Sequence, residues 1–97
     1  MTQIHVQIQD RPGGYNFDVT VGEGGSFSRH RVTLDRGDYE RLAAGRATPE
    51  ELVEESFRFL LERESKESIL GAFDLMVISR YFPSYEAEIG ERLKAKT

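Results

Sequence analysis

Arg29, Arg31 and Thr33 alternate along one segment and are the residues of this chain whose types and spacing best suit a chemical task. Alternate side chains of an extended strand point to the same face, so these three project together. Guanidinium groups bind phosphates and the edges of bases. The segment therefore predicts a nucleic-acid contact. In the competing interpretation, which we favour, the arginines pair with Asp18 and protect a strand edge from aggregation.

Other residue types that support catalysis or metal binding do not converge. His5 falls on the polar face of the predicted sheet and His30 on its core face, so they cannot share a site. The chain also has no GxSxG motif of the kind that holds the serine of a hydrolase. One acidic run lies on the polar side of a predicted helix, where a solvated surface explains it: Glu50, Glu51, Glu54 and Glu55. We therefore predict no enzyme, no cofactor and no bound metal.

The segment FDLMVISRYFPSY, residues 73–85, gathers four aromatic side chains near the C-terminus. As a helix that begins after an Asp74 N-cap, it turns Met76 to the other side and places five apolar side chains within an arc of roughly 160°: Leu75, Val77, Ile78, Tyr81 and Phe82. So much apolar surface has a packing role, because it either caps the core of the chain or meets a partner. For the second case the sequence predicts a partner interface that comprises Leu75, Tyr81, Phe82 and Tyr85.

The elements that position these residues begin with strands. Apolar and polar residues alternate with period two, and this pattern predicts an antiparallel meander of three strands at about residues 3–9, 15–22 and 27–34. Closing the second hairpin with Gly22 opposite Phe27 matches the apolar face across the pair and sets Asp18 opposite Arg31. If strand order follows the chain, the third strand is an edge of the sheet.

Four helices are predicted after the meander, at about residues 36–44, 49–64, 75–82 and 85–95. The clearest signal is Thr48-Pro49-Glu50-Glu51, in which Thr48 is an N-cap, Pro49 takes the first helical position and Glu51 completes a capping box. The helix that starts there presents roughly 200° of apolar surface. The chain therefore reads as a single α+β domain, residues 1–97, with its helices packed on one sheet face.

The composition excludes several classes of protein. The net charge of −4 falls entirely within residues 35–65, so the chain as a whole is not expected to attract nucleic acid through its global field. With no cysteine there is no disulfide framework, which fits a reducing cytoplasm. No segment approaches the 18 or so apolar residues of a membrane span. We expect a cytoplasmic protein with no membrane partner.

Two resemblances add to these patterns. The segment HRVTLDRGDYERLAAGRATPEELVEESFRFLLER, from His30 to about Glu64, resembles the ribbon-helix-helix repressors and antitoxins. That resemblance implies a DNA-reading strand, which would map to Arg29, Arg31 and Thr33. The whole chain, especially ESIL followed by FDLMVISRYFPSYE, resembles a group of short bacterial proteins whose biochemical role is not established. The second resemblance implies a shared fold and no activity.

The leading functional hypothesis is a non-enzymatic protein-interaction module that forms a homodimer or binds another protein. It rests on the number of predicted helices. One face of a three-stranded sheet accommodates roughly two helices, and this chain is predicted to form more than two. The predicted contact surface is the partner interface of the aromatic segment. The alternative is a nucleic-acid-binding regulator or antitoxin that uses the arginines of the third strand.

Overall fold

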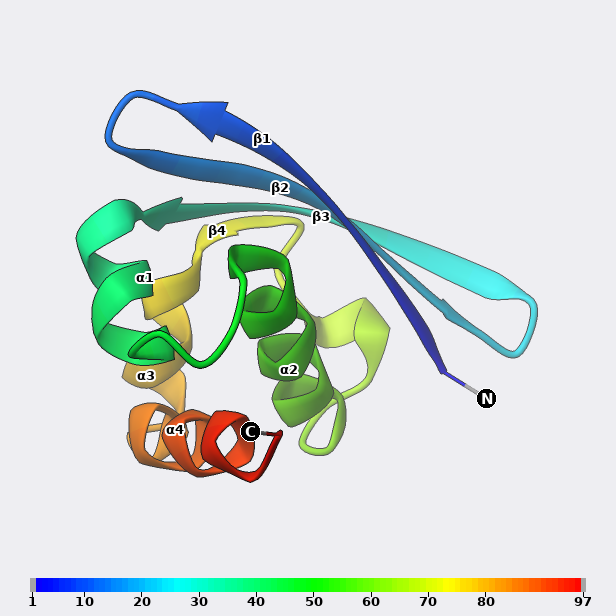
Figure 1. Ribbon diagram of the computed structural model, residues 1–97. Coiled ribbons are helices and arrows are strands. Elements are labelled where there is room, and N and C mark those ends of the chain that lie inside the picture. Colours follow the sequence, from blue (N-terminus) through cyan, green and yellow to red (C-terminus); the bar gives the residue numbers. More distant parts are fainter. Residues whose placement is uncertain (1, 97) are drawn as a thin grey trace.

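Three long strands form an antiparallel meander along one side of the molecule (Figure 1). In the computed structural model, which describes residues 2–96, they are β1 (Gln3–Arg11), β2 (Gly14–Glu23) and β3 (Ser26–Asp35). The predicted register is confirmed: Gly22 lies opposite Phe27, and Asp18 lies opposite Arg31. Each strand is one or two residues longer at its ends than the sequence pattern indicates. The α+β class and the meander are therefore as predicted.

A fourth strand, β4 (Ala72–Asp74), pairs in parallel with β3 and was not predicted. It covers Arg31–Thr33, and the Arg31 N–H donates to the Gly71 carbonyl at 2.8 Å. The sheet order is β1-β2-β3-β4. The expectation that the third strand is a free edge is therefore wrong along these residues. Pairing of β3 with a second copy of itself is therefore blocked along these residues while β4 is in place.

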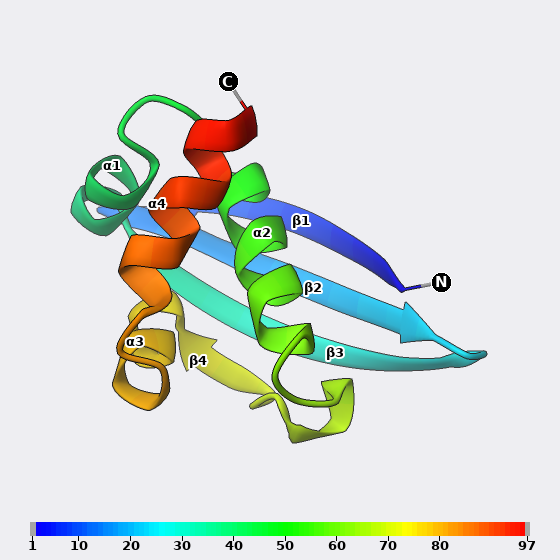
Figure 2. The ribbon, with the colours of Figure 1, turned by 90° about the horizontal axis from the view of Figure 1, so that it is seen from below.

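The helices pack on one face of the sheet, as predicted, and leave the other face uncovered (Figures 1 and 2). They are α1 (Arg36–Ala43), α2 (Pro49–Leu61), the single-turn α3 (Ile78–Tyr81) and α4 (Tyr85–Lys96). Two 3₁₀ turns, η1 (Lys66–Ser68) and η2 (Leu75–Val77), complete the chain. Within residues 2–96, no helix combines the length and the apolar character that a membrane crossing requires.

Local hydrogen bonds explain two helix boundaries. At the start of α2 the predicted capping box is present: the Glu51 N–H donates to Thr48 Oγ1 at 3.1 Å, and the Thr48 N–H donates to Glu51 Oε1 at 2.8 Å. The predicted helix 75–82 is instead η2 followed by α3. The Asp74 carboxylate accepts the Met76 N–H at 3.1 Å and so holds the tighter turn at its start.

One hydrophobic core lies between the sheet and the helices. Its buried members come from β2, β3, all four helices, η2 and the connection before β4, and they include Phe17, Val19, Val32, Leu42, Leu52, Phe57, Ile69, Leu75, Ile78, Tyr85 and Ile89. Two buried hydroxyl groups, those of Ser56 and Tyr85, meet in this layer, with their oxygens 2.6 Å apart. The Ser56 hydroxyl donates to the Leu52 carbonyl at 2.8 Å, so Tyr85 is the donor to Ser56 Oγ. This bond joins α4 to α2 inside the core.

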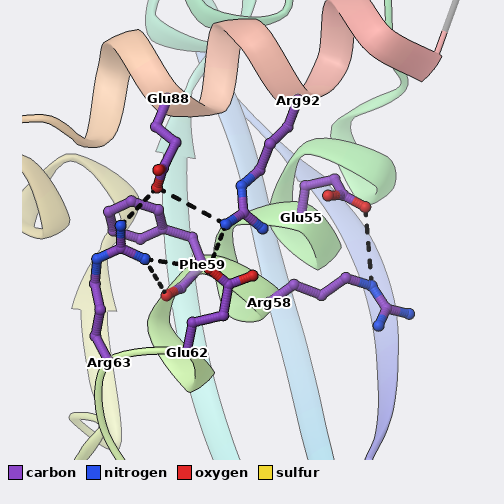
Figure 3. A network of polar contacts seen from close by, with 7 residues as sticks. All are labelled: Glu55, Arg58, Phe59, Glu62, Arg63, Glu88 and Arg92. Atoms are coloured by element: carbon purple, nitrogen blue, oxygen red, sulfur yellow. Dashed lines mark hydrogen bonds and ion pairs between the residues drawn. The ribbon is translucent and has the colours of Figure 1, made fainter.

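Arginines and glutamates that follow the end of α2 and lie within α4 join these two helices at the surface (Figure 3). Arg63 donates to Glu88 Oε2 at 2.7 Å, and Arg92 donates to Glu62 Oε1 at 2.5 Å. The Arg63 guanidinium also lies 3.7 Å from the ring centroid of Phe59, which is fully buried beneath it. The network therefore closes the core over Phe59 and fixes α4 on α2.

The charge of Glu62 makes a pH-dependent contribution to this network. Its hydrogen bond from Arg92 holds the pKa of the carboxyl below its ordinary value of about 4.5. A depressed pKa in the folded state means that the stabilisation is present at neutral pH and disappears as the pH falls through the folded pKa. The Glu62 side chain is 55% exposed, so we expect Glu62→Gln to cost no more than about 1 kcal/mol. Urea unfolding at a series of pH values from 7 downward should show the difference between the two proteins shrinking as the Glu62 carboxyl is protonated, and a difference that does not change with pH would contradict this assignment.

Candidate functional site

The aromatic segment of residues 73–85 divides between the core and the surface. Leu75 and Tyr85 are 0% exposed, whereas Tyr81 is 68% exposed and Phe82 is half-buried. The expectation that Leu75 and Tyr85 belong to a partner interface is therefore not met, because neither side chain reaches the surface. Tyr81 and Phe82 remain available to a partner.

An apolar groove lies beside the two surface aromatics and encloses about 220 Å³. Its walls come from the end of α2, the connection that follows it, β4, η2 and α3. The residues that line it are Leu60, Glu64, Ser68, Ile69, Leu70, Phe73, Val77, Ile78, Tyr81 and Phe82. Leu70 is 48% exposed and Tyr81 is 68% exposed, so large apolar side chains stand open to solvent at the rim. This combination makes the groove the candidate functional site.

The position of Leu70 depends on a buried histidine. His30 Nδ1 lies 2.8 Å from the Leu70 carbonyl, which can only accept, so this nitrogen carries the proton. His30 Nε2 lies 2.7 Å from Ser28 Oγ. The ring also packs against Phe57, with centroids 5.3 Å apart. His30 therefore anchors one wall of the groove to β3, and both of its nitrogens are occupied.

Sequence reasoning did not single out Leu70. The signal was an apolar pair, Ile69 and Leu70, before a glycine in an otherwise polar connection. The same pattern is typical of a loop whose apolar residues are buried in the core. The sequence therefore does not distinguish a buried Leu70 from an exposed one, because the difference depends on how the chain returns to β3. Ile69 is indeed buried, while Leu70 stays at the surface.

The predicted nucleic-acid residues lie on the uncovered face of the sheet. Arg29 and Arg31 are both exposed there, and they line a hollow together with His5 and Gln7. Arg31 Nε lies 3.6 Å from Asp18 Oδ1, as the competing interpretation expected. The Thr33 hydroxyl donates to Asp74 Oδ1 at 2.8 Å and so holds β4 against β3. The structure therefore brings the two arginines together and gives the threonine a structural contact.

Comparisons of the chain with protein-family models, with curated proteins and with solved structures find no match. Within residues 2–96, no three histidine or acidic side chains gather in a way that could hold a metal ion. The functional argument therefore rests on the groove and on the uncovered sheet face.

Proposed function

We propose that this protein is a non-enzymatic protein-interaction module whose groove receives an apolar side chain of a protein partner. The observation that carries the proposal is the exposure of Leu70 and Tyr81 at the rim of an apolar hollow. Interface hot spots are commonly large side chains that enter such pockets and lose all contact with water. A volume of about 220 Å³ is below the range of roughly 300–1,000 Å³ that small-molecule sites occupy. It suits one or two side chains of another protein.

The polar residues of the groove favour binding over catalysis. Of its lining residues only Glu64 carries a charge, and Ser68 Oγ lies 3.2 Å from Ser65 Oγ, with no base beside it. A nucleophile needs an adjacent base, and His30 already has partners on both nitrogens. Glu64 at the rim favours a partner that carries a lysine or arginine next to its apolar anchor.

We further propose that the module is a homodimer and acts in the cytoplasm. The cysteine-free composition supports the reducing compartment. In this proposal the groove binds another protein, and the homodimer forms through a different surface.

The proposal is tested by affinity capture from native lysate with three matched baits: wild type, a Leu70→Ser/Tyr81→Ser variant and a Phe27→Ser variant. Phe27 is a sound control because it is 69% exposed, close to the value for Tyr81, but lies on β3 away from the groove. We expect a defined partner to be lost only with the groove variant. The same set of bound proteins with all three baits would contradict the proposal.

A nucleic-acid-binding regulator remains the second candidate, and one observation supports it. Arg29 is exposed on the uncovered sheet face and makes no ion pair with any other of residues 2–96, while the exposed ring of Phe27 lies on the same strand. Single-stranded nucleic acid binds to surfaces that combine arginine with an aromatic platform. The candidate predicts salt-sensitive binding that Arg29→Ala and Arg31→Ala together abolish. No binding of a fluorescent oligonucleotide at low salt would remove it.

A further inference from the structure

The outer edge of β1 is a long strand edge without the usual protection. β1 runs for nine residues, Gln3–Arg11, and pairs with β2 in a continuous register without a bulge. It lies at the end of the sheet, and no other strand of residues 2–96 pairs with its outer side. Proteins normally blunt such edges with lysine, proline, bulges or very short strands. Between Gln3 and Gln9 this strand has none of these features.

The opposite edge of the sheet shows the contrast. It is formed by β4, which has only three residues, Ala72–Asp74, and leads directly into a 3₁₀ turn. A short strand offers too little backbone for a second chain to pair with. β4 covers β3 only along Arg31–Thr33, so the stretch Ser26–His30 of β3 is also uncovered, but it is shorter than the nine-residue edge of β1. The longest continuous edge for association is therefore that of β1.

The hydrogen-bonding groups of β1 that point outward belong to its apolar residues. The Arg31 N–H points from β3 towards β4, which fixes the alternation across the antiparallel strands. Because Asp18 lies opposite both Arg31 and Gln7, the same alternation means that the odd residues of β1 form their backbone hydrogen bonds with β2. The even residues Ile4, Val6 and Ile8 therefore direct their N–H and C=O groups away from the sheet.

The same three side chains are incompletely buried. Ile4, Val6 and Ile8 pack against the core from the side of α2 but are only half-buried, since the helical layer ends above this strand. Their order, isoleucine, valine, isoleucine, is the same when read in either direction along the strand. A strand of this kind is complementary to a second copy of itself in antiparallel orientation.

We propose that β1 pairs with β1 of a second copy of this chain, around a two-fold axis at Val6, to form one continuous eight-stranded sheet. This register sets Val6 opposite Val6 and Ile4 opposite Ile8, so the apolar row continues unbroken across the dimer. On the uncovered face it sets His5 opposite Gln7. The inference rests on the homodimer of the proposed function and not on the groove.

Sedimentation velocity on wild type and a Val6→Pro variant tests the dimer. Proline removes an N–H that points away from β2, so the sheet of the monomer keeps its hydrogen bonds. We expect wild type to be a dimer, and Val6→Pro to be a monomer with an unchanged far-UV circular dichroism spectrum. If Val6→Pro does not fold, Val6→Lys, which places a charge in the apolar row, is expected to give the same monomer. A monomeric wild type at high concentration would overturn the proposal.

Cross-linking tests the register without relying on a destabilising change. The chain contains no cysteine, so His5→Cys and Gln7→Cys each introduce a single thiol on an exposed position. In the proposed register these Cα atoms lie about 4.5 Å apart, within the reach of a disulfide. A mixture of the two variants is expected to form a covalent dimer under mild oxidation, and neither variant alone should do so. Efficient cross-linking of Gln7→Cys alone, or none in the mixture, would overturn this register.

The groove variant Leu70→Ser/Tyr81→Ser separates this inference from partner binding. It is expected to remain a dimer, whereas Val6→Pro is expected to keep the capture of the groove's partner. Loss of the dimer in the groove variant would place the two-fold contact at the aromatic segment and overturn pairing through β1.

Discussion

Replacing Tyr85 with alanine is expected to lower the free energy of unfolding by about 3–5 kcal/mol, the range for large aromatic side chains in a core. Tyr85 is 0% exposed, and its ring packs edge-to-face on Phe59 with centroids 5.3 Å apart. Its hydroxyl donates to Ser56 inside the α2–α4 contact. The substitution therefore leaves a cavity and removes the hydrogen-bond donor to Ser56 Oγ, which keeps only its own bond to Leu52.

Tyr81→Ala is the matched control for this result. The residue lies only four positions away but is 68% exposed, so its loss is expected to change stability by less than about 0.5 kcal/mol. Urea unfolding of the two variants and wild type measures both effects. Equal costs at the two positions would mean that the division of the segment into core and surface is wrong.

Gly14→Ala is expected to destabilise the protein by about 1–3 kcal/mol, as for other changes that overfill a packed site. Gly14 is buried where β2 meets the end of β3. A Cβ there would lie 3.0 Å from Asp35 Cα and still closer to the Leu34 carbonyl oxygen. Both are backbone atoms and cannot turn away, so the β2–β3 pairing must open at this end.

Gly90→Ala supplies the opposite expectation. Gly90 lies in the middle of α4, and a Cβ there would meet no atom within 4 Å. Alanine favours the helical backbone by up to about 1 kcal/mol over glycine, so this variant should be more stable than wild type. Thermal unfolding of both variants checks the pair. A stabilised Gly14→Ala protein would show that the strands can separate there without cost.

The meander could be predicted because its information is local. Alternation along β2 and β3 fixes which side chains share a face, and a slip of one residue would expose Phe17, Val19 and Val32 together. The capping box of α2 was equally accessible, since both of its hydrogen bonds join residues three positions apart. In each case the determining contacts are close in sequence or repeat with a regular period.

The groove could not be predicted because it depends on contacts between distant residues. β4 has only three residues and no alternating pattern, and its place beside β3 depends on the path of the intervening helices. The helical wheel of residues 75–82 failed for a related reason. A 3₁₀ turn precedes α3, so successive side chains do not follow one helical period, and Leu75 and Tyr81 separate between core and surface.

The parallel pairing of β4 also determines the order in which the chain assembles and opens. The hydrogen bond from Thr33 to Asp74 joins residues 41 positions apart, whereas the hairpins of the meander close through tight turns. Distant pairings form late because the connecting chain must first be ordered. The groove should therefore be the last part to form and the first to open. In native-state hydrogen exchange, the Arg31 amide, bonded to Gly71, is expected to exchange faster than its neighbour Val32, bonded within the meander.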